Sequence, residues 1–206
     1  MSALAQVPSD FLTALGTLRK AHCRTELRLE ELPAPSRLAP YAVALGAEVI
    51  GRTGATPVHG PAMMAAARIE PAELATGRFI LLHDPDGSPL WDGTFRIVTY
   101  IRAQLEADIG NDAMLGSVAW TWLVEALETH NAPYRAAGGT ATRILSESYG
   151  TLSDRQDSID IELRASWTPA SADVRSHLEA WSDMVCTFAG LPPLPDGVSA
   201  LPRRRN

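Results

Sequence analysis

Ile159-Asp-Ile-Glu-Leu-Arg-Ala-Ser-Trp167 decides the fold of this chain, because apolar and polar residues alternate along it without a break. This period of two is that of a β-strand with one face on a core and the other face turned outward. Thr168 and Pro169 end the strand, and Ser171 is a suitable N-cap for the helix that follows. That helix has one apolar stripe, made of Val174, Leu178, Trp181, Val185 and Phe188.

The same order of elements occurs twice in the second half of the chain. The first copy runs from Phe79 through a strand over 95–101 to a helix that carries Ala119 and Trp120. The second copy runs from Thr140 through the strand over 159–167 to the helix with Ala180 and Trp181. Two strand–strand–helix units in succession predict an antiparallel sheet with helices laid on it.

The first half adds further elements to this sheet. A helix is predicted over 9–22, capped by Ser9, with Phe11, Leu15, Leu18 and His22 on one face. Alternation predicts a half-exposed edge strand over 25–32 and another strand over 41–50. The apolar runs over 78–83 and 94–102 predict two central strands that are covered on both faces. The expected fold is α+β, with a mainly antiparallel sheet of five to six strands and three principal helices.

The domain organisation follows from composition. Residues 1–190 are predicted to form a single domain, interrupted at about 51–73 by a Gly/Pro/Ala-rich insertion that includes Met63 and Met64. Residues 191–206, with four prolines and the run Arg203 to Arg205, are predicted to be a disordered tail.

Charge and cysteine content limit the functional classes. A formal net charge of -6 over 206 residues argues against a general nucleic-acid surface. Cys23 and Cys186 are too few for a disulfide framework and lack the spacing of a structural zinc site. No signal-peptide pattern and no apolar run of membrane length are present. A cytoplasmic protein is therefore expected.

Five stretches together resemble a known family: Gly77–Pro85, Trp91–Arg96, Val118–Leu123, Ala137–Thr140 and Arg164–Pro169. They are similar to an actinobacterial family of unknown function, the one numbered three thousand in the domain-of-unknown-function series. This resemblance implies an actinobacterial cytosolic protein and brings no assigned activity. The predicted order of elements is also similar to the type III secretion chaperone-like fold, whose members bind other proteins and commonly dimerise. That second likeness is one of topology alone.

Two groups of polar residues contain side chains of the kinds found in metal or catalytic sites. His83, Asp84 and Asp86 share one turn, but Ser88, Pro89 and Phe95 stand where a calcium loop needs other residues, so local turn hydrogen bonds explain the carboxylates. Glu125, Glu128 and His130 lie on the middle helix without a matching second motif elsewhere. Neither a metal nor a cofactor is therefore expected.

Among the five tryptophans, Trp91 is the candidate for a partner contact. Aromatic residues on a sheet can bind nucleobases, but such a platform needs Arg or Lys interleaved on the same face. Trp167 and Trp181 follow core periodicities. Trp91 instead lies in a turn, and with Asp92 and Arg96 it is the candidate contact for a protein partner.

The middle helix, expected over 112–130, is apolar on nearly all sides. A helix of this kind is buried between two layers, and the second layer is either the first helix, the insertion around Met63 and Met64, or a second subunit. Leu123 and Val124 are accordingly predicted as contacts in a homodimer.

The expected function is a non-catalytic protein-interaction or adaptor domain. One alternative is an enzyme that uses the turn from His83 to Asp92 on a small molecule, for which a pocket joining His83, Asp92 and Arg96 would be the sign. Another is an accessory protein in RNA metabolism that recruits RNA through the Arg-rich tail.

Overall fold

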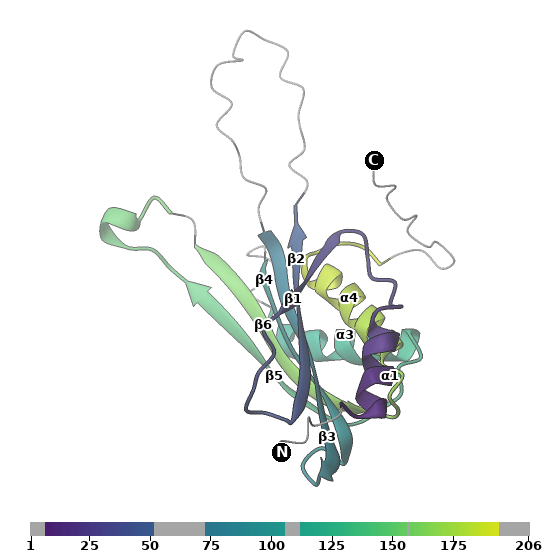
Figure 1. Cartoon of the computed structure of the whole chain (residues 1–206). Helices are drawn as coiled ribbons and strands as arrows, with labels where there is room; N and C mark the ends of the chain where they lie inside the picture. The colour runs from purple at the N-terminus through teal and green to yellow at the C-terminus, as the bar shows by residue number, and fades with distance from the viewer. Residues whose placement is uncertain (1–6, 52–72, 106–111, 156, 194–206) are drawn as a thin grey trace.

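The fold was determined from a computed structural model, which describes residues 7–51, 73–105, 112–155 and 157–193 (Figure 1). In chain order the elements are α1 (Ser9–Leu18), β1 (Leu27–Leu32), β2 (Tyr41–Ile50), β3 (Glu73–Ser88), β4 (Gly93–Leu105), α3 (Leu115–Thr129), β5 (Tyr134–Ser146), the short 3-10 turn η1 (Gly150–Leu152), β6 (Ser158–Pro169) and α4 (Arg175–Phe188). The α+β fold with an antiparallel sheet and three principal helices is confirmed.

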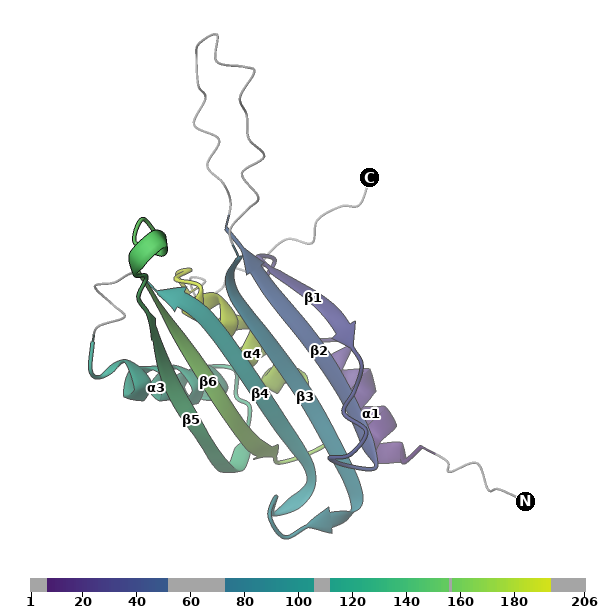
Figure 2. The same ribbon diagram turned by 90° about the vertical axis from the view of Figure 1, so that its left-hand side faces the viewer.

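The six strands form one antiparallel sheet in the order β1-β2-β3-β4-β6-β5 (Figure 2). β3 and β4 lie in its middle and β1 lies at one edge, as the sequence predicted. All three helices cover the same face of the sheet (Figures 1 and 2). We call this the helix face, and the opposite side the open face.

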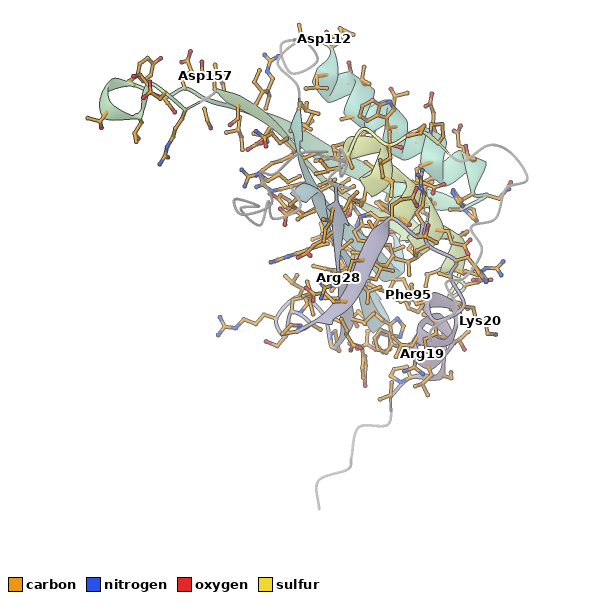
Figure 3. All side chains as sticks on the ribbon, turned by 90° about the horizontal axis from the view of Figure 1, so that it is seen from above. Arg19, Lys20, Arg28, Phe95, Asp112 and Asp157 are labelled. Atoms are coloured by element: carbon orange, nitrogen blue, oxygen red, sulfur yellow. The ribbon has the colours of Figure 1, made fainter. Side chains whose placement is uncertain are left out.

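The core lies between the helix face and the helices. The apolar side of β6 is as predicted, since Ile161, Leu163 and Trp167 are fully buried toward the helices, but Asp160 and Glu162 on its other side are buried as well. The apolar stripe of α4 is also confirmed, because Val174, Leu178, Trp181, Val185 and Phe188 are all buried. In Figure 3, which looks down on the molecule, Phe95 lies on the side of the sheet that faces α1.

The two strand–strand–helix units pack against each other through β4 and β6, which pair antiparallel with Tyr100 opposite Arg164. The tryptophan of each unit's helix lies on a glycine in the first strand of the other unit. An added Cβ on Gly139 of β5 would be 2.9 Å from the Trp120 ring, and one on Gly77 of β3 would be 2.7 Å from the Trp181 ring. The Ala-Trp pairs seen in the sequence therefore mark equivalent contacts between the two units.

The predictions of what covers the central strands and the middle helix were wrong. β3 and β4 were expected to be covered on both faces, but Arg78 is exposed on the open face, and Ile80, Val98 and Tyr100 are half-buried there. The helix α3 was expected between two layers, but it has an exposed polar side formed by Ser117, Thr121, Glu125 and Glu128. Within the described residues, the helices are the outer layer on this side of the sheet.

Several element ends also differ from the prediction. His22 lies beyond the end of α1 and is exposed. Pro8, not Ser9, precedes α1 as N-cap, and Val174, not Ser171, does so for α4. β5 begins at Tyr134, and a bulge between Arg135 and Gly138 interrupts its pairing with β6.

Two predicted segments fall mostly outside the described residues. The insertion at 51–73 is described only at Gly51 and Glu73, and the tail at 191–206 only over 191–193. In that short described part, the Pro192 carbonyl accepts a 2.8 Å hydrogen bond from Arg24, a buried residue. Among the described residues, no helix has the length and apolar character needed to cross a membrane.

Candidate functional site

The open face of the sheet contains a hollow that is lined by residues of all six strands. We call it the groove; its volume is about 810 Å³. All six strands contribute to the groove, and β5 does so through its pair of glycines. The lining residues are far apart in sequence and include Glu30, Leu32, Gly46, Glu48, Thr76, Arg78, Ile80, Val98, Tyr100, Gly138, Gly139, Arg164 and Ser166. The strand register places these residues in adjacent rows across the sheet.

A row of alternating charge and aromatic character crosses the middle of the groove. Arg78, Tyr100 and Arg164 are direct cross-strand neighbours on β3, β4 and β6. The Arg164 guanidinium lies over the Tyr100 ring at 5.5 Å from its centroid, which is within cation–π range. Arg78 is exposed, and within the described residues it forms no hydrogen bond or ion pair through its side chain.

Glu162 holds the Tyr100 and Arg164 side chains in place. Its carboxylate accepts a 2.8 Å hydrogen bond from the Tyr100 hydroxyl and forms a 2.7 Å ion pair with Arg164. Burial of the phenol, and then the hydrogen bond to this carboxylate, raises the pKa of Tyr100. In the next row Arg102 pairs with Asp160 at 2.6 Å. The Tyr100 phenol is therefore a neutral hydrogen-bond donor, and Glu162 and Arg164 together fix the position of its ring.

Two glycines of the groove differ in what lies over them. Gly46 lies between Glu30 on β1 and Arg78 on β3, and an added Cβ there would be 3.0 Å from Leu32. Leu32 therefore leans across β2 over the space left by the missing side chain. Gly138 at the far end has no atom within 4 Å of an added Cβ, so the groove is open there. Gly138 and Gly139 lie within the strand β5.

The charges in the groove are separated across the sheet. Glu30 and Glu48 lie on β1 and β2, whereas Arg78 and Arg164 lie on β3 and β6. These four are the charged residues that line the groove within the described chain. One wall is thus acidic, the other is basic, and Tyr100 lies on the basic side.

The three residues predicted around Trp91 belong to one network at the end of the sheet. Thr168 on β6 joins them, since its hydroxyl donates to the Trp91 carbonyl and accepts a 3.1 Å hydrogen bond from Arg96. Arg96 also donates to the Ser166 hydroxyl at 2.7 Å and to the Ala136 carbonyl at 2.8 Å, in the bulge of β5. Burial lowers the pKa of Arg96.

Asp92 extends this network to β5. Its backbone adopts a φ of 55°, and its carboxylate pairs with Arg135 at 3.1 Å. Trp91 is half-exposed and lines a second hollow of about 420 Å³ with Arg37, Pro40 and Asp84. The sequence found these residues because they cluster locally in the turn, but it did not show that Arg96 holds the β5 bulge.

His83 is separated from these residues by the sheet itself. It is 2% exposed on the helix face, where it stacks on Phe95 with ring centroids 4.2 Å apart and on Phe11 at 5.8 Å. Its Nδ1 bonds the Thr94 carbonyl at 3.1 Å. Arg96 points from the open face, so the structure brings no pocket together from His83, Asp92 and Arg96. Asp84 accepts a 3.1 Å bond from the Asp86 backbone, as expected of a local turn.

The residues predicted on α3 lie in different environments. Leu123 is 2% exposed and belongs to the core of the single chain, whereas Val124 is half-buried. His130 at the end of α3 is bonded at 2.6 Å to Asp183 of α4, and this hydrogen bond raises the pKa of His130. In the described part of the chain, no three His, Cys, Asp or Glu side chains are grouped so that they could hold a metal ion.

Sequence reasoning missed Arg78, Ile80, Val98 and Tyr100 as members of a surface. The signal was present, because Arg78 in β3 and Arg96 and Arg102 in β4 all fall on the side of the strands that became the open face. The apolar residues on the same side, Ile80 and Val98, hid this signal.

Comparison with known proteins agrees with the family resemblance. The model of the family described as "Protein of unknown function (DUF3000)" matches residues 7–199. No curated protein and no solved structure matches the chain. The chain belongs to the DUF3000 family.

Proposed function

We propose that this member of the DUF3000 family is a non-catalytic protein-interaction module, and that its partner-binding surface is the open face of the sheet. The observation that carries the proposal is the groove of about 810 Å³ on the face opposite the helices. A hollow of this size, with apolar Ile80 and Val98 beside fixed polar groups, has the character of a binding site.

Binding is favoured over catalysis by the placement of the titratable groups. The groups that an enzyme would have used around His83 lie on opposite faces of the sheet. In the groove, the carboxylates and arginines are spread over several strands, and the Tyr100 phenol is held by Glu162. These groups can fix the orientation of a bound chain.

Trp91, Asp92 and Arg96 extend the proposed surface along the sheet. Ser166 lines the groove and also accepts a hydrogen bond from Arg96, so the network around Trp91 is connected to the groove. A half-exposed tryptophan that is held through its backbone is a suitable anchor for a partner side chain. The free cysteines Cys23 and Cys186 support a reducing compartment, and we place the protein in the cytoplasm.

Site-specific photocrosslinking in the native host tests the proposal. A photoreactive benzoylphenylalanine replaces Val98 in the groove, and in the matched control it replaces Thr121, which is exposed on α3. We expect a discrete crosslinked protein from position 98 that is absent from position 121 and lost when Arg78→Glu is added. Equal crosslinking from both positions, or none from position 98, contradicts the proposal.

A further inference from the structure

We infer that the groove takes an extended polypeptide segment that carries acidic residues beside apolar ones, with its carboxylates on Arg78 and Arg164. This inference rests on the proposed function and names the chemistry of the partner. It is carried by the length of the groove, by its separate acidic and basic walls, and by the apolar residues Ile80 and Val98 in the row beside Arg78 and Tyr100.

The length of the groove fits a short extended segment. Its lining residues run from β1 to β5, which are the two edges of the six-stranded sheet. With strands about 4.8 Å apart, this crossing is about 24 Å, which equals about seven residues of extended chain. At the β5 end, an added Cβ on Gly138 would meet no atom within 4 Å, so this glycine leaves room for a backbone to lie close to the sheet.

The two arginines of the groove explain why an acidic segment is preferred. Arg78 is exposed and has no side-chain partner within the described residues, whereas Arg164 is already aligned by Glu162 and Tyr100. A carboxylate bound between these two arginines would be held by charge-assisted hydrogen bonds. Ile80 and Val98 lie in the adjacent row and are half-buried, so they offer contact to an apolar side chain of the same segment.

A nucleic acid fits the groove less well than a peptide does. Phosphates placed along the same path would meet Glu30 and Glu48 on the acidic wall. The Tyr100 ring is covered by Arg164, so stacking a base on that side would require Arg164 to move. A peptide carries both acidic groups and backbone amide donors, and the donors suit the acidic wall.

The test is a titration of the full chain followed by NMR. The probes are an acetylated seven-residue peptide in which leucine alternates with aspartate, the same peptide with lysine in place of aspartate, and a uridine oligonucleotide. We expect the aspartate peptide to shift the amide signals of Gly46, Arg78, Tyr100 and Gly138, and to bind about fivefold or more tightly than the lysine peptide. Arg78→Glu should reverse this preference, and Arg78→Lys should retain it.

Arg19→Glu is the matched control, because it makes the same charge change just beyond α1, in the helix layer (Figure 3). It should leave the peptide preference unchanged, and circular dichroism should show each variant folded. Equal binding of both peptides, tighter binding of the oligonucleotide, or shifts confined to the helices would overturn the inference. Failure of photocrosslinking at position 98 would contradict the proposed function itself. Crosslinking to a partner without any preference for the aspartate peptide would contradict only the partner chemistry.

Discussion

At the scale of single residues, Gly138 and Gly139 are adjacent in sequence but differ in their surroundings. An added Cβ on Gly139 would lie 2.7 Å from the Arg164 carbonyl oxygen and 2.9 Å from the Trp120 ring, and one on Gly138 would meet nothing within 4 Å. Because backbone cannot give way cheaply, Gly139→Ala should destabilise the fold by about 1–3 kcal/mol. Gly138→Ala should remain within about 1 kcal/mol of the native chain. Urea unfolding of the two variants checks this, and equal midpoints would contradict the close contact between the two units.

The buried residue His177 makes the stability of the chain sensitive to acid. Burial lowers the pKa of this histidine to about 4, and the Trp167 indole donates a 3.1 Å hydrogen bond to its Nδ1. The unfolded histidine titrates near 6.5, so below that pH the unfolded chain binds a proton that the folded chain does not. The His177 contribution is therefore complete above about pH 6.5 and falls by about 3 kcal/mol as the pH drops to 4.

The variant His177→Asn, which keeps an acceptor for the indole but does not titrate, checks this sign. Its free energy of unfolding should fall less than that of the native chain between pH 7 and pH 4.5. Parallel pH curves for the native chain and His177→Asn would show that burial of His177 does not make the stability sensitive to acid.

His130 is the contrasting case, because the Asp183 hydrogen bond raises its pKa. The stabilising contribution of His130 is present below pH 6.5 and is lost as the pH rises through the raised pKa.

At the scale of the elements, strand and helix positions could be predicted because each has a strong period of its own. The strand β6 alternates, and the stripe of α4 follows the helical period. Exposure was harder to predict, since β3 and β4 carry apolar residues on both sides. A half-buried Ile80 or Val98 in a groove looks the same in sequence as a core residue. The apolar character of α3 suggested a second covering layer. Part of that character is explained within the helix layer itself, because Trp122 packs on Phe188 of α4.

The helix α3 offers a test of the predicted homodimer. Leu123→Glu should unfold the chain, because it places a carboxylate in the core without a partner. Thr121→Glu, two residues away on the exposed side, should change stability by no more than about 0.5 kcal/mol. If α3 also forms the dimer, Val124→Glu should produce monomers with a near-native circular dichroism spectrum. Sedimentation of the unmutated chain as a monomer at tens of micromolar would rule this dimer out.

At the scale of the whole molecule, the candidate site depends on which strands become neighbours. Trp91, Asp92 and Arg96 could be grouped from sequence because they are close along the chain. The groove could not, because Glu30, Arg78 and Arg164 come together only through the order β1-β2-β3-β4-β6-β5. Antiparallel pairing alone allows several orders for six strands. In particular, the pairing of β4 with β6 rather than with β5 places Arg164 beside Tyr100.

Substitutions on the two faces of the sheet should have different effects. Those on the helix face should reduce stability, and those on the open face should reduce binding. Ile97 and Val98 are neighbours in β4, but Ile97 is fully buried toward the helices and Val98 is half-buried in the groove. Ile97→Ala should therefore cost about 2–5 kcal/mol in unfolding free energy, measured by urea titration. Val98→Ala should cost about 1 kcal/mol, because less apolar surface is lost from contact. Binding of the aspartate peptide should show the opposite order: folded Ile97→Ala should retain its affinity, whereas Val98→Ala should weaken it. If both substitutions reduced stability equally and left binding unchanged, the open face would be a second core surface, and the groove would not be the binding site.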